Sequence, residues 1–262
     1  ASEMARQRGD VELISAANAN AHLANFSSFL NWAVNEEVIA RNPMRSLRLP
    51  DTLAKKDKRN PFNGEQLQAI FNAPLYRGCQ DGERGYAKEG EERPRNARFW
   101  VPLIGLHTGM RLNEICQLDV TDVRDVEGVH CIVVSERSLD GADDKTLKTV
   151  ASERLIPVHP TLIACGFRAF GRERKRVGHI KLFHEIDPGP RGKRAVAFSK
   201  WFTQFSRACG AYRSRTSFHS FRHNFRDELR VAGINHDIAM VLGGWSTGGS
   251  SGRASENYGS GF

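Results

Sequence analysis

Strand-forming composition is confined to two short runs of this chain, which limits the folds that it can adopt. Residues 129–135 and 154–158 are rich in β-branched or aliphatic side chains, and a long polar segment at 140–148 connects them. Elsewhere apolar residues recur at helical spacing. We expect helices at about 18–40, 63–71, 112–118, 161–177, 197–209, 218–231 and 236–242. The pattern predicts a mainly α protein with a small antiparallel β-sheet, an α+β fold.

A basic segment divides the chain into two parts. Residues 41–59 are rich in Arg and Lys, contain Pro43 and Pro50, and show little periodic hydrophobicity, which is typical of a linker. The helix before it, with Phe29 and Trp32 widening its expected buried face, is too short to enclose a core alone. We therefore predict that residues 1–57 are part of a helical domain plus a linker, and that 58–262 form a second domain. Within that domain, residues 77–98 are almost devoid of apolar side chains and predict a solvated surface loop.

Composition favours an acidic partner and a cytoplasmic protein. The net charge is +8, and an excess of this size favours polyanions such as nucleic acid. No run approaches the roughly 18 apolar residues that span a bilayer, so we expect no membrane association. The five cysteines are widely spread and include no Cys-x-x-Cys pair, which indicates reduced thiols rather than disulfides or a zinc site.

Three short segments place costly polar residues in apolar surroundings. The first, HTGMRLNEICQL, contains Arg111 and Glu114; the second, HSFRH, begins at His219; the third is GGW at 243–245, followed later by ENY. A guanidinium among apolar residues is almost never buried without an anionic partner. Taken singly, each residue has an ordinary structural explanation, such as an ion pair between Arg111 and Glu114. These single-residue explanations do not account for the occurrence of all three segments in this order along the chain.

Together these segments resemble the catalytic domain of the tyrosine recombinases, the phage integrase family. The first two segments resemble the family's two arginine boxes, and the third resembles its closing segment. Lys148-Thr149, with Ser152, Arg154 and Ile156-Pro157, resembles the family's lysine-bearing β-hairpin. The resemblance runs from about 60 to 258 and extends to the N-terminal helix. It implies that 1–57 is the C-terminal part of a core-binding domain and 58–262 the catalytic domain.

The resemblance implies a role for each of six catalytic residues: Arg111, Lys148, His219, Arg222, Trp245 and Tyr258. The two arginines suit the non-bridging oxygens of a phosphodiester, because fixed bidentate cations match a tetrahedral oxyanion.

The other four residues of this set are expected to activate the nucleophile and stabilise the leaving group. Tyr258 is the expected nucleophile; its hydroxyl has an ordinary pKa of about 10 and therefore needs a base, which is His219. Lys148 is the expected general acid, with Lys145 as the alternative, and Trp245 would donate its indole N–H to the phosphate. Two further residues, Glu114 and His223, are expected to support this set.

The implied function is site-specific recombination or integration of double-stranded DNA through a 3′-phosphotyrosyl intermediate. Neither ATP nor a metal ion or other cofactor is implied, and the family resemblance implies dimers or tetramers on DNA. Such a protein is expected in the cytoplasm, at the bacterial nucleoid when bound to DNA. Two alternatives remain: a type IB topoisomerase-like strand transferase, and a catalytically silent DNA-binding protein of the same fold.

The segment that carries Tyr258 departs from the family pattern. It runs 13 positions from Trp245 to Tyr258, longer than is usual in the family, and is rich in glycine and serine. We expect a weakly held loop that leaves the Tyr258 hydroxyl away from both arginines when DNA is absent. The Gly-x-Ser-x-Gly string at 248–252 lacks the strand and helix of a hydrolase elbow. The His219 and His223 pair lacks the glutamate of a zinc helix.

Overall fold

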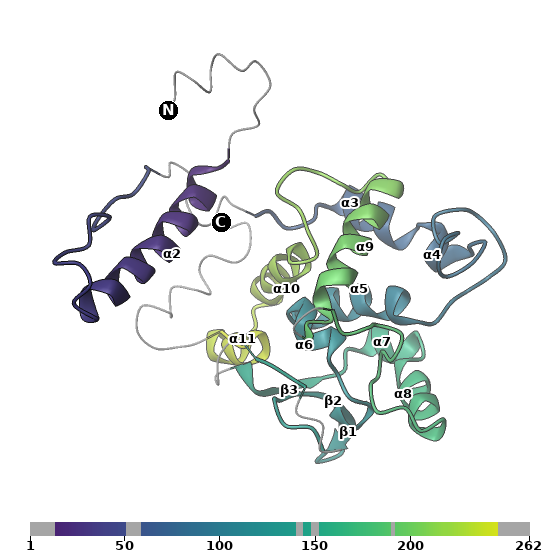
Figure 1. The fold of residues 1–262 in the computed structure, drawn as a ribbon. Helices are drawn as coiled ribbons and strands as arrows, with labels where there is room; N and C mark the ends of the chain where they lie inside the picture. Colours follow the sequence, from purple (N-terminus) through teal and green to yellow (C-terminus); the bar gives the residue numbers. More distant parts are fainter. Residues whose placement is uncertain (1–13, 51–58, 140–143, 148–151, 190–191, 246–262) are drawn as a thin grey trace. The chain divides into compact units, whose positions relative to one another are not determined.

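The computed structural model describes residues 14–50, 59–139, 144–147, 152–189 and 192–245. The chain divides into two compact units, Ala1–Ala54 and Lys55–Phe262 (Figure 1). Each unit is considered separately below. No helix within the described ranges combines the length and the apolar character needed to cross a bilayer.

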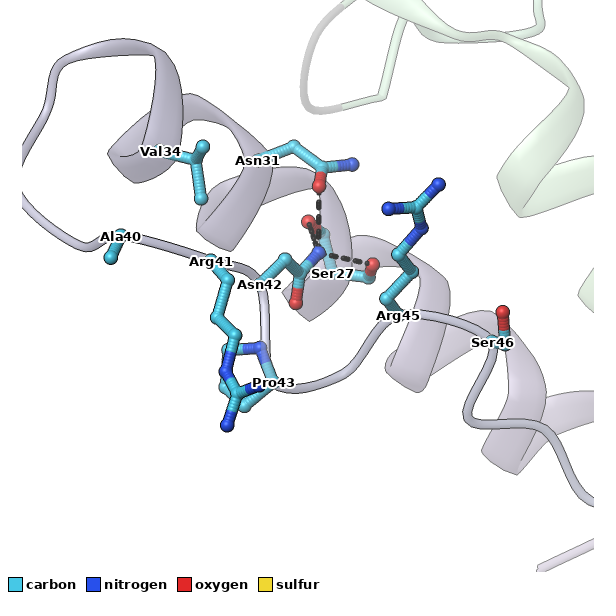
Figure 2. A pocket seen from close by; sticks show the side chains of 9 residues that line it. All are labelled: Ser27, Asn31, Val34, Ala40, Arg41, Asn42, Pro43, Arg45 and Ser46. Atoms are coloured by element: carbon cyan, nitrogen blue, oxygen red, sulfur yellow. Dashed lines mark hydrogen bonds between the residues drawn. The ribbon is translucent and has the colours of Figure 1, made fainter.

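In the N-terminal unit the described residues, 14–50, form one long helix and a returning segment. Helix α2 covers Ala16–Asn35 and is capped by the Ser15 hydroxyl, which accepts the N–H of Asn18 at 3.2 Å. The predicted end at residue 40 is wrong, because Glu37 adopts a φ of 58° and turns the chain back. The returning segment is fixed by amide side chains: Asn42 donates to both oxygens of Ser27 and to Asn31 (Figure 2).

The aromatic face of α2 is exposed within its own unit. Phe26, Phe29 and Trp32 form a stacked row, with ring centroids 6.3 and 5.7 Å apart, and each is more than half exposed. Of the residues on α2, Ala33 is the buried one. The prediction that Phe29 and Trp32 widen a buried face is therefore wrong for this unit, because the returning segment at 36–50 leaves both side chains more than half exposed.

The larger unit contains most of the regular structure. In chain order its elements are α3 (Gly64–Phe71), α4 (Pro74–Arg77), α5 (Ala97–Thr108), α6 (Leu112–Cys116), the 3-10 turn η2 (Val120–Asp122), β1 (Val123–Val126), β2 (Val129–Val134), β3 (Arg154–Pro157), α7 (Pro160–Ala164), α8 (Phe167–Arg176), α9 (Ala195–Ala208), α10 (Ser220–Val231) and α11 (His236–Gly243). The predicted fold class, mainly α with a small antiparallel sheet, is confirmed.

Three strands of the described residues form one antiparallel sheet in the order β1-β2-β3. The register pairs Val126 with Val129 across a tight turn and Ile132 with Ile156 between the two predicted strands. Strand β1 was not predicted. It is an edge strand of four residues whose two central side chains, Arg124 and Asp125, are charged and exposed, so that it lacks the apolar alternation of a half-buried strand.

Two further expectations need correction. The predicted helix at 161–177 is two helices, because Gly166 takes a φ of 92° between α7 and α8. The segment at 77–98 is not simply a solvated loop. Tyr86 packs edge-on against Trp201 and Phe205, Cys79 is fully buried, and α5 begins within the segment at Ala97. A few well-placed side chains therefore anchor a segment whose average composition is polar.

Helix α5 lies at the centre of the larger unit and contributes much of its core. In Figure 1 the sheet lies on one side of α5 and helices α3 and α9 on the other. Helix α10 packs along α5, where a Cβ on Gly105 would lie 2.7 Å from the Phe218 ring. The first segment of the unit is tied to α10 as well, because Asn224 exchanges two hydrogen bonds with the backbone of Phe62, at 3.0 and 2.7 Å. This packing places the start of α10 beside the end of α5.

Candidate active site

The junction between α5 and α10 brings the two arginine-containing segments together. Gly109 ends α5 with a φ of 60°, and a Cβ there would lie 2.4 Å from the Phe225 ring, so that only glycine fits both the backbone and the space. Its carbonyl oxygen accepts a hydrogen bond from Nη1 of Arg222 at 2.6 Å. Residues more than a hundred positions apart in sequence are therefore in direct contact two residues before Arg111.

Arg111 is held by an ionised carboxylate and a hydroxyl. Its Nη1 donates to Oε1 of Glu114 at 2.7 Å and to Oγ of Ser152 at 3.2 Å, and its backbone N–H donates to Oε2 of Glu114 at 3.0 Å. Burial would raise the pKa of Glu114, but Arg154 and then Arg111 outweigh it and hold the pKa below its usual value. The Arg111 side chain remains 23% exposed, whereas that of Glu114 is 2% exposed. Glu114 thus anchors Arg111 while leaving part of its guanidinium accessible.

Arg222 is enclosed between a backbone carbonyl and an indole ring. It is 1% exposed, and its guanidinium carbon lies 4.5 Å from the Trp245 ring centroid, within the range of a cation–π contact. Arg226, one helical turn further on, lies 5.3 Å from the same ring. Trp245 is itself buried and follows α11 directly. The indole therefore fixes the plane of the Arg222 guanidinium.

His219 and His223 occupy the first turn of α10, with ring centroids 5.5 Å apart. Burial lowers the pKa of His219 to about 3, and the positive charges of Arg59, Arg222 and Arg111 add to that effect. Burial likewise lowers the pKa of His223 to about 4. Both imidazoles are therefore neutral at neutral pH, which is the state that a proton acceptor needs. We refer to Arg111, His219, Arg222 and Trp245 as the arginine cluster.

The depressed histidine pKa values predict a pH dependence of stability. Between the folded pKa values of about 3 and 4 and the ordinary value of 6.5, the unfolded chain binds more protons than the folded one. The contribution of these histidines to the free energy of unfolding should thus be complete above pH 6.5. It should decrease as the pH falls toward 4, by up to about 1.4 kcal/mol per pH unit for each histidine. Urea unfolding at a series of pH values measures this slope.

A matched set of variants assigns that slope to the two histidines at the start of α10. His219→Gln and His223→Gln should each flatten it, whereas His22→Gln, at an exposed position on α2, should leave it unchanged. An identical slope between pH 6.5 and 4 in all three variants would contradict the assignment.

The expected nucleophile and the two candidate general acids are not part of the arginine cluster as described. Lys148 and Tyr258 lie outside the described residues, as does the segment between Trp245 and Tyr258. Lys145 is described and buried: its Nζ lies 2.8 Å from an oxygen of Asp119 and 2.8 Å from one of Asp122. Its ammonium is therefore held by two carboxylates, in a side chain that is 1% exposed.

Comparison with known proteins identifies the family. The sequence model described as the phage integrase family matches residues 101–253, more than half of the chain. The chain belongs to the phage integrase family. The matched range contains the whole arginine cluster and the sheet. No curated protein matches the chain.

Solved integrases share the fold. The Tn1549 transposon integrase, in complex with transposon right end DNA, has a TM-score of 0.57 at 22% identity over 92% of this chain and 74% of that chain. A lambda integrase dimer bound to a COC′ core site has a TM-score of 0.58 at 18% identity, over 92% and 59% of the two chains. A lambda integrase tetramer bound to a Holliday junction has a TM-score of 0.55 at 16% identity, over 87% and 58%. The chain therefore spans less than two thirds of the lambda chains.

Three arginines that lie near the cluster in this integrase were not identified as site residues from the sequence. Arg59 was assigned to the linker, although its charge acts on His219. Arg226 lies four positions after Arg222, and this helical spacing could have indicated it. Arg154 was noted only as part of the hairpin pattern. Nothing in its sequence position shows that its guanidinium bonds Glu114, forty positions away.

Proposed function

We propose that this chain is a site-specific DNA recombinase that cleaves and rejoins duplex DNA through a covalent bond to Tyr258. The observation that supports it best is the arginine cluster, in which Arg222 bonds the Gly109 carbonyl beside Arg111, His219 and Trp245. Two positioned guanidiniums beside a neutral imidazole form a set suited to an in-line displacement at a phosphodiester. Membership in the phage integrase family supports the same reaction.

In the proposed reaction the Tyr258 oxygen attacks the phosphorus and transfers its proton to His219. The bond from phosphorus to the 5′ oxygen breaks, and that oxygen takes a proton from Lys148. Arg111 and Arg222 stabilise the charge that develops on the non-bridging oxygens. The 3′-phosphotyrosyl bond retains the energy of the phosphodiester, so that a 5′-hydroxyl of a partner strand reverses the step. The scheme requires neither ATP nor a metal ion.

The proposed substrate is double-stranded DNA, bound by dimers or tetramers of the chain. Integrases of the same fold have been solved on DNA as a dimer and as a tetramer, and the net charge of +8 favours a polyanion. In this proposal residues 1–57 are the C-terminal part of a core-binding domain and its linker. Arg41 and Arg45 line a pocket at the turn that Asn42 fixes (Figure 2), where their charges are available to DNA phosphates.

The test is capture of a covalent adduct. The full chain is incubated with labelled duplexes of randomised sequence, each with one nick, so that a released 5′-hydroxyl fragment diffuses away after cleavage. Adducts that survive denaturing electrophoresis are sequenced. We expect a defined set of sequences joined through their 3′-phosphates. Tight, sequence-specific binding without any adduct would favour the silent DNA-binding alternative, and relaxation of supercoils without strand exchange would favour the topoisomerase alternative.

The two lysines make separable predictions. Lys148→Ala should slow cleavage of an ordinary duplex by about 10²–10⁴-fold, as loss of a general acid does. A duplex with sulfur at the 5′-bridging position should restore the rate, since a thiolate leaves without a proton. Lys145→Ala removes the ammonium beside Asp122, while Asp119 keeps its ion pair with Lys181 at 2.8 Å. It should cost roughly 3–5 kcal/mol of stability without a sulfur-specific rescue. Rescue of Lys145→Ala but not of Lys148→Ala would reverse the assignment.

A further inference from the structure

We propose that Arg154 is a positioning residue that fixes Arg111 and Trp245 in one frame; this inference rests on the proposed function. Arg154 is the first residue of β3, and its side chain is 1% exposed. Each of its three guanidinium nitrogens donates to a different acceptor. Nε donates to the carbonyl of Leu242 at 2.9 Å, Nη1 to the carbonyl of Ser152 at 2.7 Å, and Nη2 to Oε2 of Glu114 at 2.9 Å.

The first arm of this contact reaches Arg111 through Glu114. Oε2 of Glu114 accepts from both Arg154 and the backbone N–H of Arg111, while Oε1 accepts from the Arg111 guanidinium. The carboxylate thus lies between two arginines, one buried and one partly exposed. Without Arg154, a single cation would hold it, and its orientation would no longer be fixed from the side of the sheet. The exposed guanidinium would then lose its alignment.

The second arm reaches Trp245 through the end of α11. Leu242 lies in the last turn of that helix, where carbonyl groups have no partner within the helix and a cation is favourable. Gly244 follows in the left-handed region, and a Cβ there would lie 2.9 Å from Nη1 of Arg154. The chain can therefore pass directly over the guanidinium only at a glycine. Trp245 comes next and packs on Arg222.

These contacts join three segments that are far apart in the sequence: α6, the entry to β3, and the end of α11. A buried cation with a carboxylate is a weak source of stability, because desolvation offsets much of the attraction. The planar guanidinium instead fixes the relative orientation of the three acceptors, since its donors point to them at fixed angles. We therefore expect its loss to slow cleavage more than it weakens DNA binding.

The test compares Arg154→Met and Arg154→Lys with Arg168→Met, which removes an exposed arginine paired with Asp125 on the neighbouring strand β1. Single-turnover cleavage is measured at saturating DNA, well below each variant's unfolding temperature, together with the DNA dissociation constant. Arg154→Met should cleave about 10²-fold more slowly, the effect of displacing a catalytic group by about 1 Å, with affinity little changed. Arg154→Lys should not restore the rate, because an ammonium lacks the fork. Arg168→Met should behave as wild type.

A double-mutant cycle separates positioning from general destabilisation. In an Arg111→Lys, Trp245→Phe background, Arg154→Met should cost only a small fraction of its effect in the wild type, because the groups that it aligns are already altered. An equal loss in both backgrounds, or wild-type cleavage by Arg154→Met, would overturn the inference. Absence of any adduct with the wild-type chain would instead refute the proposed function.

Discussion

Replacing Tyr258 by Phe is expected to eliminate the covalent protein–DNA adduct while leaving DNA affinity nearly unchanged. The substitution removes one oxygen atom, and that atom is the proposed nucleophile. The charges that are proposed to bind the phosphates, on Arg111 and Arg222, are untouched. Denaturing electrophoresis of the reaction with a nicked duplex measures the adduct, and a gel-shift titration measures the affinity.

The chain offers a matched control for this variant. It has four tyrosines; Tyr76 and Tyr86 pack in aromatic clusters, and Tyr212 is 41% exposed. Tyr212→Phe removes the same oxygen from an accessible side chain and should form the adduct at the wild-type rate. An adduct that persists in Tyr258→Phe and disappears in Tyr212→Phe would move the nucleophile to Tyr212.

Replacing Arg222 by Lys should slow cleavage by at least about 10²-fold, the loss typical of a preorganised oxyanion donor. Lysine keeps the positive charge but has no planar fork, so that it cannot hold one donor on the Gly109 carbonyl and a second at the fixed angle that the guanidinium provides. The plane that stacks on Trp245 is lost as well. Single-turnover cleavage at saturating DNA measures the effect, with the unfolding midpoint determined alongside.

Arg226→Lys is the control for Arg222→Lys. Arg226 lies on the same helix and near the same indole, but has no bond to the end of α5 in the described structure. It should lose much less activity. Cleavage by Arg222→Lys at the wild-type rate would remove the main support for a phosphate site at this junction.

The fold class could be predicted because its signals are local, and the cluster because its segments resemble those of a known family. Helical spacing, the two aliphatic strands and the glycine at 109 each lie within a short window of sequence. The apolar residues around Arg111 and Arg222 in the sequence indicated that both guanidiniums need an anionic partner. That the two arginines serve one site was implied by the resemblance of their segments to the arginine boxes of the phage integrase family.

What could not be predicted depends on contacts between distant segments. Strand β1 pairs through its backbone, which its exposed Arg124 and Asp125 do not reveal. Tyr86 gave no sign that it packs on α9, because a single aromatic residue in a polar segment has no periodicity. The linkage of Arg154 to Glu114 and Leu242 spans 40 and 88 positions. The roles of Lys148 and Tyr258 remain predictions.

The hydrogen bond from Arg222 to the Gly109 carbonyl also bears on when the protein acquires its chemistry. The bond spans 113 positions, and Asn224, beside it on α10, pairs with Phe62 across 162. Contacts of such long sequence separation are costly to form, because the loop-closure entropy of the intervening chain opposes them. A chain in which α10 is not folded therefore lacks the paired guanidiniums even when Arg111 and its helix are in place. The proposed cleavage of DNA is therefore expected only in molecules in which α10 is folded, and local unfolding of α10 is expected to abolish it.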